Sequence, residues 1–192
     1  MLTVIIPTRD SERALVQTLA PLVSGATAGL ITEVIVADGG SHDATSEVAD
    51  LAGCTYTASD ASLGARLKAA AAAARTPWLL FLRPGCVPEP GWIESVETFI
   101  AGGETSERAA AFRSRTDEIE QPGLITFFGT LKAALLGVPV RPEQGLLIAR
   151  RVYDHFGGHA ATPDCEAALL SRLGRGRLTL LAAAARPPRP HT

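Results

Sequence analysis

Short apolar runs alternate with helix-forming segments along the first hundred residues, and this alternation most narrows the possible folds. The apolar runs cover residues 2–6, 33–37, 54–57 and 78–82, and the segments with helical character cover residues 11–23, 44–52, 63–75 and 91–100. Strands that alternate with helices indicate βα units and a parallel sheet. The runs are apolar throughout, so helices should cover both faces of the sheet. We therefore predict an α/β protein with a doubly wound, mainly parallel sheet.

The second half of the chain is less regular. Residues 109–113 and 145–150 are predicted to be strands, and residues 124–136 and 165–174 are predicted to be helices. Residues 187–192 are rich in proline, which favours a frayed tail. No linker divides the rest, so we expect a single domain at 1–186.

Several polar residues have a structural interpretation. Asp43 is predicted to cap the helix at residues 44–52, and Asp10 or Ser11 to cap the first helix. His155 and His159 flank a Gly-Gly turn without partners at metal-binding spacing, so each is expected to be structural or solvated. Cys86 is interpreted as a small packing residue.

The composition excludes some classes of function. A formal net charge of −2 provides no general basic field for nucleic acid. Three widely spaced cysteines favour neither a disulfide framework nor a zinc site, and they suit a reducing cytoplasm. The amino terminus lacks a basic leader and is read as a strand. The apolar segment at residues 123–140 is too short and interrupted for a confident membrane span; a core helix and a helix on the membrane surface are both left open.

Polar residues follow three of the predicted strands, and parallel strands bring their carboxyl ends to one edge of the sheet. The groups are Thr8-Arg9, Asp38-Gly39-Gly40 and Arg83-Pro84-Gly85. A carboxylate can accept hydrogen bonds from a base or ribose, arginine can hold a diphosphate, and glycine lets a ligand approach the backbone. The combination suits a nucleotide. The chain has neither Gly-x-Gly-x-x-Gly nor a Gly-Lys-Ser/Thr loop, which argues against dinucleotide and P-loop proteins.

Four blocks of sequence carry a resemblance. They read TVIIPTRDSERALVQTLAPL, EVIVADGGSHDATSEVA, LGARLKAAAAAARTPWLLFLRPGCVPEPGW and RPEQGLLIARRVYDHFGG. Together, and in this order, they resemble family 2 glycosyltransferases, above all a small bacterial subgroup of single-domain enzymes. The resemblance implies the Rossmann-like GT-A fold and a UDP- or GDP-type sugar donor, usually bound with Mn²⁺ or Mg²⁺. It also implies that the sugar is transferred with inversion of its anomeric centre. The resemblance does not identify the acceptor, and a lipid-linked acceptor is among the candidates.

The resemblance assigns the nucleotide side to about residues 1–100. Pro7 and Thr8 match the end of the family's first strand, which borders the base. Asp38 matches the acid that contacts the base, and Gly39 belongs to the turn after it. Arg66 lies where the family often has a basic residue near the diphosphate. The alternatives are that Asp38 caps the next helix and that Arg66 lies on a solvated helix face.

The acceptor side is assigned to about residues 101–186. Asp164 matches the family's general base, and Glu166 follows two residues later. Gln144 and Gly145 match the block before the late strand. Asp164 could instead be the N-cap of the helix at residues 165–174, where acidic residues are favoured anyway.

The chain departs from the family pattern after residues 78–82. The family has Asp-x-Asp there, and its last acid binds the metal; this chain has Arg83, Pro84 and Gly85. None of these side chains carries a carboxylate for a hard metal ion, so the metal assignment does not transfer. One interpretation is a metal-independent enzyme in which arginine, above all Arg83, neutralises the charge of the diphosphate. The other is a non-catalytic GT-A-like domain that binds a nucleotide or a partner. A different Rossmann-like enzyme that acts on a small metabolite is a third possibility.

We expect a cytoplasmic protein. It could work at the inner face of the membrane with peripheral membrane contact, and nucleic acid is not expected as a partner.

Overall fold

Four parallel strands form the first half of the sheet in the computed structural model, which describes residues 1–102, 107–114 and 140–188. They are β1 (Leu2–Thr8), β2 (Ile31–Asp38), β3 (Thr55–Ala58) and β4 (Trp78–Phe81), and they lie in the order β3-β2-β1-β4. In the register of β1 and β2, Thr8 pairs with Asp38. The predicted strand ends therefore do meet at one edge.

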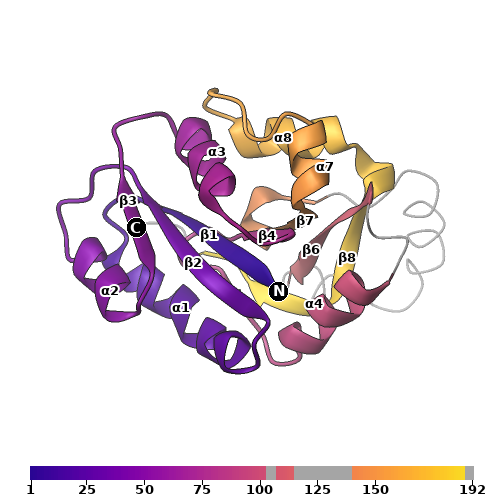
Figure 1. The fold of residues 1–192 in the computed structure, drawn as a ribbon, viewed down its shortest axis with the longest axis horizontal. Helices are drawn as coiled ribbons and strands as arrows, with labels where there is room; N and C mark the ends of the chain where they lie inside the picture. The colour runs from indigo at the N-terminus through magenta and orange to yellow at the C-terminus, as the bar shows by residue number, and fades with distance from the viewer. Residues whose placement is uncertain (103–106, 115–139, 189–192) are drawn as a thin grey trace, which may run out of the picture.

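Helices cover both faces of this sheet, as the apolar strands predict (Figure 1). The helices α1 (Glu12–Thr27), α2 (Thr45–Leu51) and α4 (Trp92–Ala101) lie on one side, and α3 (Leu63–Ala73) lies on the other. Every residue of β1 and of β4 is buried.

The second half adds four strands to the other side of β4. They are β5 (Val87–Pro88), β6 (Ala109–Ser114), β7 (Leu146–Ala149) and β8 (Leu178–Arg186). Within the described residues the full order is β3-β2-β1-β4-β7-β6-β8-β5. Strand β7 is antiparallel to both of its neighbours, β6 and β8 are parallel, and β5 is antiparallel to β8.

The connecting helices of this half are α7 (Arg150–His155) and α8 (Cys165–Leu173), with 3-10 turns η2 (Pro142–Gln144) and η3 (Arg175–Arg177). Both helices lie on the same side of the sheet as α3 (Figure 1). The strand predicted at 145–150 ends at Ala149, because Arg150 already begins α7. The helix predicted at 124–136 lies outside the described residues.

Strand β8 was not predicted. Its second half, residues 182–186, reads AAAAR, and alanine carries little signal for a strand. In the structure its alanines pair with β6 and β5, so the sheet partners decide their conformation. The chain is therefore ordered in a sheet up to Arg186, where the predicted tail begins.

One carboxylate joins the starts of two helices. Asp43 accepts hydrogen bonds from the backbone N–H of Thr45 (3.1 Å), the first residue of α2, and from that of Glu12 (3.0 Å), the first residue of α1. Asp43 thus binds the first N–H group of α2, as predicted, although the N-cap position itself is Ala44. The prediction that Asp10 or Ser11 caps α1 was wrong. Ser11 is at the N-cap position but its side chain makes no capping bond there, and Asp10 Oδ1 accepts instead from the backbone N–H of His42 (2.7 Å).

Cys86 is completely buried, which confirms its interpretation as a packing residue. None of the helices within the described part of the chain combines the length and the apolar character that crossing a membrane requires.

Candidate functional site

A cleft of about 500 Å³ opens at the carboxyl ends of β1 and β4. Five of the residues that the sequence predicts for the site line it: Pro7, Thr8, Arg66, Arg83 and Glu166. The cleft also includes Arg9 and Pro84, which belong to the groups predicted at the strand ends. Its other lining residues were not considered for the site from the sequence: Ser11, Ala14, Leu63, Glu143 and Pro188. The nucleotide and acceptor halves thus contribute to one cavity.

Asp38 lies beneath this cleft and is 0% exposed. Its Oδ1 accepts hydrogen bonds from Thr8 Oγ1 (2.6 Å) and Ser41 Oγ (2.5 Å), and its Oδ2 accepts from the backbone N–H groups of Gly40 (2.8 Å) and Ser41 (2.7 Å). A carboxylate has about four acceptor positions, and all of them are in use here. In this arrangement Asp38 holds the end of β1 against the turn after β2.

The same hydrogen bonds set the charge of Asp38. Burial by itself raises the pKa of this carboxyl group, but the hydrogen bonds from Ser41 and Thr8 outweigh burial and lower the pKa to about 2. Asp38 is therefore ionised at neutral pH, and its charge is spread over four donors.

Arg66, near the start of α3, lies over the ends of β1 and β2. Its Nη1 donates to the backbone carbonyl oxygens of Thr8 (3.1 Å) and Ala37 (2.5 Å). A Cβ added to Gly39 would lie 2.9 Å from the Arg66 guanidinium carbon, so the absence of a side chain at Gly39 makes room for this arginine. Burial lowers the pKa of Arg66, and the nearby Asp38 carboxylate partly offsets this effect.

Arg83 forms the charged centre of the cleft. Its Nε donates to both carboxylate oxygens of Glu166 (3.2 and 3.0 Å), and its Nη2 also binds that carboxylate. Its Nη1 donates to Glu143 Oε1 (3.0 Å). The hydrogen bond with Glu166, followed by the charges of Glu166 and Glu143, raises the pKa of Arg83 despite its partial burial.

Three separate elements build this centre. Arg83 follows the buried strand β4, Glu143 lies in η2, and Glu166 lies in the first turn of α8. The loop after Arg83 is fixed by Gly85, whose φ of +86° is strained for other residues and whose backbone N–H donates to Thr18 Oγ1 (2.8 Å).

Three residues predicted for the acceptor side do not line the cleft, and neither do Asp38 and Gly39 of the nucleotide side. Asp164 is exposed at the N-cap position of α8, without a side-chain capping bond. Gln144 is buried, and its side chain accepts from the backbone N–H of Arg141 (2.7 Å) and donates to the backbone oxygen of Phe112 (2.9 Å). Gly145 is buried with a φ of +74°. Both residues shape the entry into β7 rather than face the cavity.

The cleft does not fit a divalent metal ion in this arrangement. Its only lining carboxylates among the described residues are Glu143 and Glu166, and both already bind the guanidinium of Arg83. Nowhere in the described ranges do three or more His, Cys, Asp or Glu side chains gather as metal ligands. A metal ion beside Arg83 would place two positive centres on the same pair of carboxylates.

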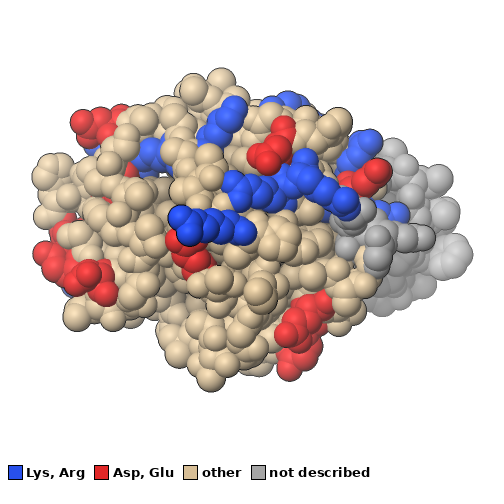
Figure 2. Space-filling model, viewed as in Figure 1, with Lys and Arg blue, Asp and Glu red and all other residues tan. Residues whose placement is uncertain are grey.

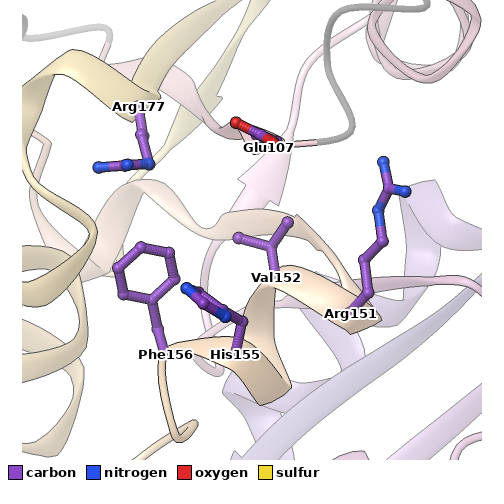
Figure 3. A pocket seen from close by; sticks show the side chains of 6 residues that line it. All are labelled: Glu107, Arg151, Val152, His155, Phe156 and Arg177. Atoms are coloured by element: carbon purple, nitrogen blue, oxygen red, sulfur yellow. The ribbon is translucent and has the colours of Figure 1, made fainter.

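A second cavity, of about 430 Å³, lies at the opposite edge of the sheet. Since β7 is antiparallel to β4, its last residue Ala149 pairs with Trp78, the first residue of β4, and α7 begins there. The cavity is lined by Glu107, Arg151, Val152, His155, Phe156 and Arg177 (Figure 3). The Arg177 guanidinium carbon lies 5.4 Å from the centre of the Phe156 ring. None of the predicted nucleotide or acceptor residues lies in this cavity, so the cleft beside β1 and β4 is the candidate site.

The surface charge is unevenly distributed although the net charge is small. Figure 2 shows Lys and Arg side chains gathered in a band across the middle of one face, while Asp and Glu lie mostly toward its margins. The formal net charge of −2 therefore hides local basic surface.

His159 lies in the core beside the cleft. It is 2% exposed, its Nδ1 lies 2.9 Å from the hydroxyl of Tyr153, and its ring packs edge-on against Phe81. Burial, with a smaller contribution from the charge of Arg172, lowers the pKa of His159 to about 4. The structural interpretation of this histidine is confirmed.

Acid should destabilise the fold through His159. Its folded pKa of about 4 is below the unfolded value of 6.5, so between these values the unfolded state binds more protons. The free energy of unfolding should fall by about 3 kcal/mol as the pH falls from 6.5 to 4. Urea unfolding across this range measures the effect. His159→Gln should remove most of the slope and the exposed His155→Gln should keep it; equal slopes in all three proteins would contradict the prediction.

The fold and the cleft define a class of protein. A glucosyl-3-phosphoglycerate synthase from Mycobacterium tuberculosis, in complex with Mn²⁺, UDP and glucosyl-3-phosphoglycerate, matches with a TM-score of 0.72 at 19% identity, over 100% of this chain and 73% of that chain. A mannosyltransferase from Pyrobaculum calidifontis, in complex with GDP-Man and Mn²⁺, matches with a TM-score of 0.74 at 14% identity, over 98% of this chain and 57% of that chain. The chain thus has the α/β GT-A fold of these glycosyltransferases, as its sequence predicts.

The family follows from the sequence itself. The sequence model of glycosyl transferase family 2 matches residues 3–155, and the chain belongs to this family. No curated protein matches the chain well enough to count as a relative.

Proposed function

We propose that this protein transfers a sugar from a UDP- or GDP-type nucleotide sugar to an acceptor hydroxyl. The observation that carries the proposal is the cleft at the carboxyl ends of β1 and β4, where Arg9, Arg66 and Arg83 lie in a family 2 glycosyltransferase. Arginine binds phosphate groups through parallel, charge-assisted hydrogen bonds. A nucleotide diphosphate supplies two such groups.

The proposed donor lies across the strand ends. Pro7, Thr8 and the turn at Gly39 border the base, and Asp38 acts by holding this turn, since its four hydrogen bonds stay within the protein. Arg66 and Arg83 lie on the diphosphate side. Positive charge there stabilises the leaving diphosphate as the bond to the sugar breaks.

The acceptor approaches from the second half of the chain. Asp164 takes the proton from the acceptor hydroxyl as the oxygen attacks the anomeric carbon, which inverts that centre. The helix α8 carries both Asp164, at its N-cap, and Glu166, which lines the cleft. Gln144 and Gly145 set the path of the chain into β7 beside the acceptor side. A lipid-linked acceptor would bring this cytoplasmic protein to the inner face of the membrane.

We further propose that the domain spans residues 1–186 and works without a metal. Arg83, Pro84 and Gly85 take the place of the family's acid pair. The ion pairs of Arg83 with Glu143 and Glu166 support this proposal, since they occupy the carboxylates that a metal would need.

The same ion pairs favour a second candidate. A charge centre that is already satisfied inside the protein suits a GT-A-like domain that binds a nucleotide or a partner without catalysis. A measurement of sugar transfer distinguishes the two candidates, because only the transferase turns over its donor.

Calorimetric titration with UDP, GDP and their sugars, with and without Mn²⁺, tests the proposal. We expect one nucleotide to bind, with a dissociation constant that Mn²⁺ changes less than about twofold. In the transferase, Asp164→Asn should abolish transfer and leave nucleotide binding intact, because Asp164 lies outside the cleft. Absence of binding by every nucleotide would refute the proposed function, and unchanged turnover in Asp164→Asn would remove Asp164 from the mechanism.

A further inference from the structure

The second cavity lies where three strands of the second half meet α7. Ala109, at the start of β6, pairs with Ile148 of β7 and with Leu178 at the start of β8. The starts of β6 and β8 therefore lie beside the end of β7, from which α7 continues. In Figure 3, Arg177 and Glu107 lie on one side of the cavity, and side chains of α7 and its C-cap lie on the other. The sheet thus brings distant segments of the chain to one cavity.

Arginine flanks the strand ends at this edge of the sheet. The residues are Arg75 before β4, Arg108 before β6, Arg150 and Arg151 after β7, and Arg175 and Arg177 before β8. In Figure 2 the band of Lys and Arg side chains crosses the region of α7, which borders the cavity. The cavity therefore opens in basic surface, on which an anion is attracted.

Arg177 is the cation that is best placed to meet a ligand in this cavity. Its guanidinium lies over the ring of Phe156, whose face attracts a positive charge and holds the group in position. Among the described residues no carboxylate forms an ion pair with Arg177, and no protein oxygen accepts its hydrogen bonds. The guanidinium groups of Arg83, Arg150 and Arg172, by contrast, donate to oxygen atoms of the protein. The donors of Arg177 are thus oriented and available.

We infer that this cavity is a second ligand site, which binds a small organic phosphate that carries hydroxyl groups, such as a sugar phosphate. Arg177 binds the phosphate, Glu107 accepts hydrogen bonds from the hydroxyl groups, and the ring of Phe156 packs against the body of the ligand. The site lies at the opposite edge of the sheet from the cleft, and it is independent of the proposed sugar transfer.

Charge and volume favour an organic phosphate over a simple anion. Arg151 and Arg177 against Glu107 give the described lining a formal charge of +1 with His155 neutral. A phosphate monoester carries about −1.5 to −2 at neutral pH, and arginine binds it through a fork of donors. The volume of about 430 Å³ is in the range of small-molecule sites and exceeds what a phosphate ion fills. The ligand therefore has a body beside its phosphate.

Glu107 identifies the chemistry of that body. This exposed carboxylate lines the cavity, and it repels a phosphate. An ionised carboxylate only accepts hydrogen bonds, so it needs donors from the ligand, and hydroxyl groups supply them without adding charge. Val152 and Phe156 provide the apolar surface on which the carbon skeleton packs. A hydroxylated organic phosphate satisfies all three kinds of lining group.

Calorimetric titration with glucose 6-phosphate, inorganic phosphate and glucose tests the ligand class. We expect glucose 6-phosphate to bind about tenfold more tightly than inorganic phosphate, because it also contacts Glu107 and Phe156. Glucose alone should bind more weakly than either. Arg177→Ala should weaken the binding of glucose 6-phosphate about tenfold. Arg175→Ala, an exposed change in the same turn η3 that does not line the cavity, is the matched control and should bind as wild type. Unchanged binding in Arg177→Ala would overturn the inference.

Nuclear magnetic resonance of the histidine rings locates the ligand. The chain has four histidines, and of the described ones only His155 lines the cavity. His155→Gln identifies its resonance. Glucose 6-phosphate should shift the resonance of His155 and leave that of His42, which adjoins the loop after β1, in place. Arg83→Ala should bind glucose 6-phosphate as wild type does. A shift of His42 alone, or loss of binding in Arg83→Ala with binding kept in Arg177→Ala, would place the ligand in the cleft and refute the second site.

Glu107→Ala tests the role of the carboxylate. Inorganic phosphate should bind about twofold to threefold more tightly to this variant, because a repelling charge is removed. The advantage of glucose 6-phosphate over inorganic phosphate should shrink from about tenfold to about twofold, because the hydroxyl groups lose their acceptor. Glu94→Ala, an exposed change in α4, is the control and should keep the wild-type ratio. A wild-type ratio in Glu107→Ala would refute this role.

The same chemistry occurs in a free metabolite and in a lipid head group, and sedimentation with vesicles distinguishes the two sources. Vesicles of phosphatidylcholine are compared with and without phosphatidylinositol 4-phosphate. Sedimentation that needs this lipid and is lost in Arg177→Ala identifies a head group, whereas binding of glucose 6-phosphate without sedimentation identifies a free ligand. Binding of neither would overturn the inference.

These experiments are independent of the proposed function. If no nucleotide binds but glucose 6-phosphate binds through Arg177, the proposed function fails and the second site stands. If nucleotides bind and neither glucose 6-phosphate nor the vesicles do, only the second site fails. Thermal unfolding checks that each variant folds.

Discussion

Replacing Gly64 with alanine is expected to destabilise the protein by about 2–4 kcal/mol. In the interior of a helix this change normally stabilises, by about 0.5–1 kcal/mol, because glycine loses more backbone freedom on folding. Here a Cβ on Gly64, in α3, would lie 1.7 Å from the backbone oxygen of Ala160 and 2.9 Å from the Cβ of Cys165. A backbone carbonyl cannot turn aside as a flexible side chain can, so α3 and the segment before α8 must separate.

The effect should reach the cleft as well as the stability. The segment that would move leads directly into Asp164 and Glu166, while α3 itself carries Arg66. The melting temperature should fall by roughly 10 °C, and binding of any nucleotide in the cleft should weaken. Scanning calorimetry and nucleotide titration measure the two effects.

Gly176 provides a matched control for the same chemical change. A Cβ at this position would meet no atom within 4 Å, and its backbone does not require glycine. Gly176→Ala should therefore change the free energy of unfolding by less than about 0.5 kcal/mol. If Gly64→Ala proved as stable as Gly176→Ala, α3 and the segment at Ala160 would not be in the close contact described above.

The first half of the fold could be predicted because its signals are local. The apolar runs 2–6 and 78–82 are long enough, and end sharply enough, to define β1 and β4. Parallel pairing then brings Thr8 and Asp38 together without further information, since each is the last residue of its strand and the two strands end side by side. Strand β8 carried no such signal, because its alanines take their conformation from β5 and β6.

The charges of the site could not be predicted in the same way. Arg66 and Arg83 were both expected on the diphosphate side. No sequence pattern indicated that Arg66 binds backbone oxygens or that Arg83 binds carboxylates. Arg83 and Glu166 are 83 positions apart, so only the folded chain makes them partners. Glu143 was not predicted for the site, although it directly precedes Gln144, which was. The available signal was Arg83 itself, because a basic residue at the end of a buried strand indicates that an acid faces it.

The charge of Asp38 leads to the second large effect that we expect. Asp38→Ala should destabilise the protein by about 3–5 kcal/mol, because four donors lose the buried carboxylate that they share. The donors belong to Thr8, Gly40 and Ser41, and they fix the turn that borders the proposed base position. The variant should therefore lose nucleotide binding even at temperatures where it is still folded. Chemical unfolding and nucleotide titration at pH 7 test both expectations.

The acid dependence of stability shows whether the charge itself matters. The folded pKa of Asp38, about 2, is below its ordinary value of 3.8, so its ionised form stabilises the fold above pH 3.8, and this contribution is lost as the pH falls from 3.8 to 2. The loss should amount to about 2 kcal/mol. This loss of stability occurs at lower pH than the loss expected from His159, so one pH series can separate the contributions of the two groups.

Asp38→Asn keeps the size of the side chain but not its charge, and turns one acceptor into a donor that faces other donors. It should be destabilised at pH 7 and should lack the decline between pH 3.8 and 2. A variant as stable as wild type at pH 7 would mean that the ionised carboxylate does not hold the turn.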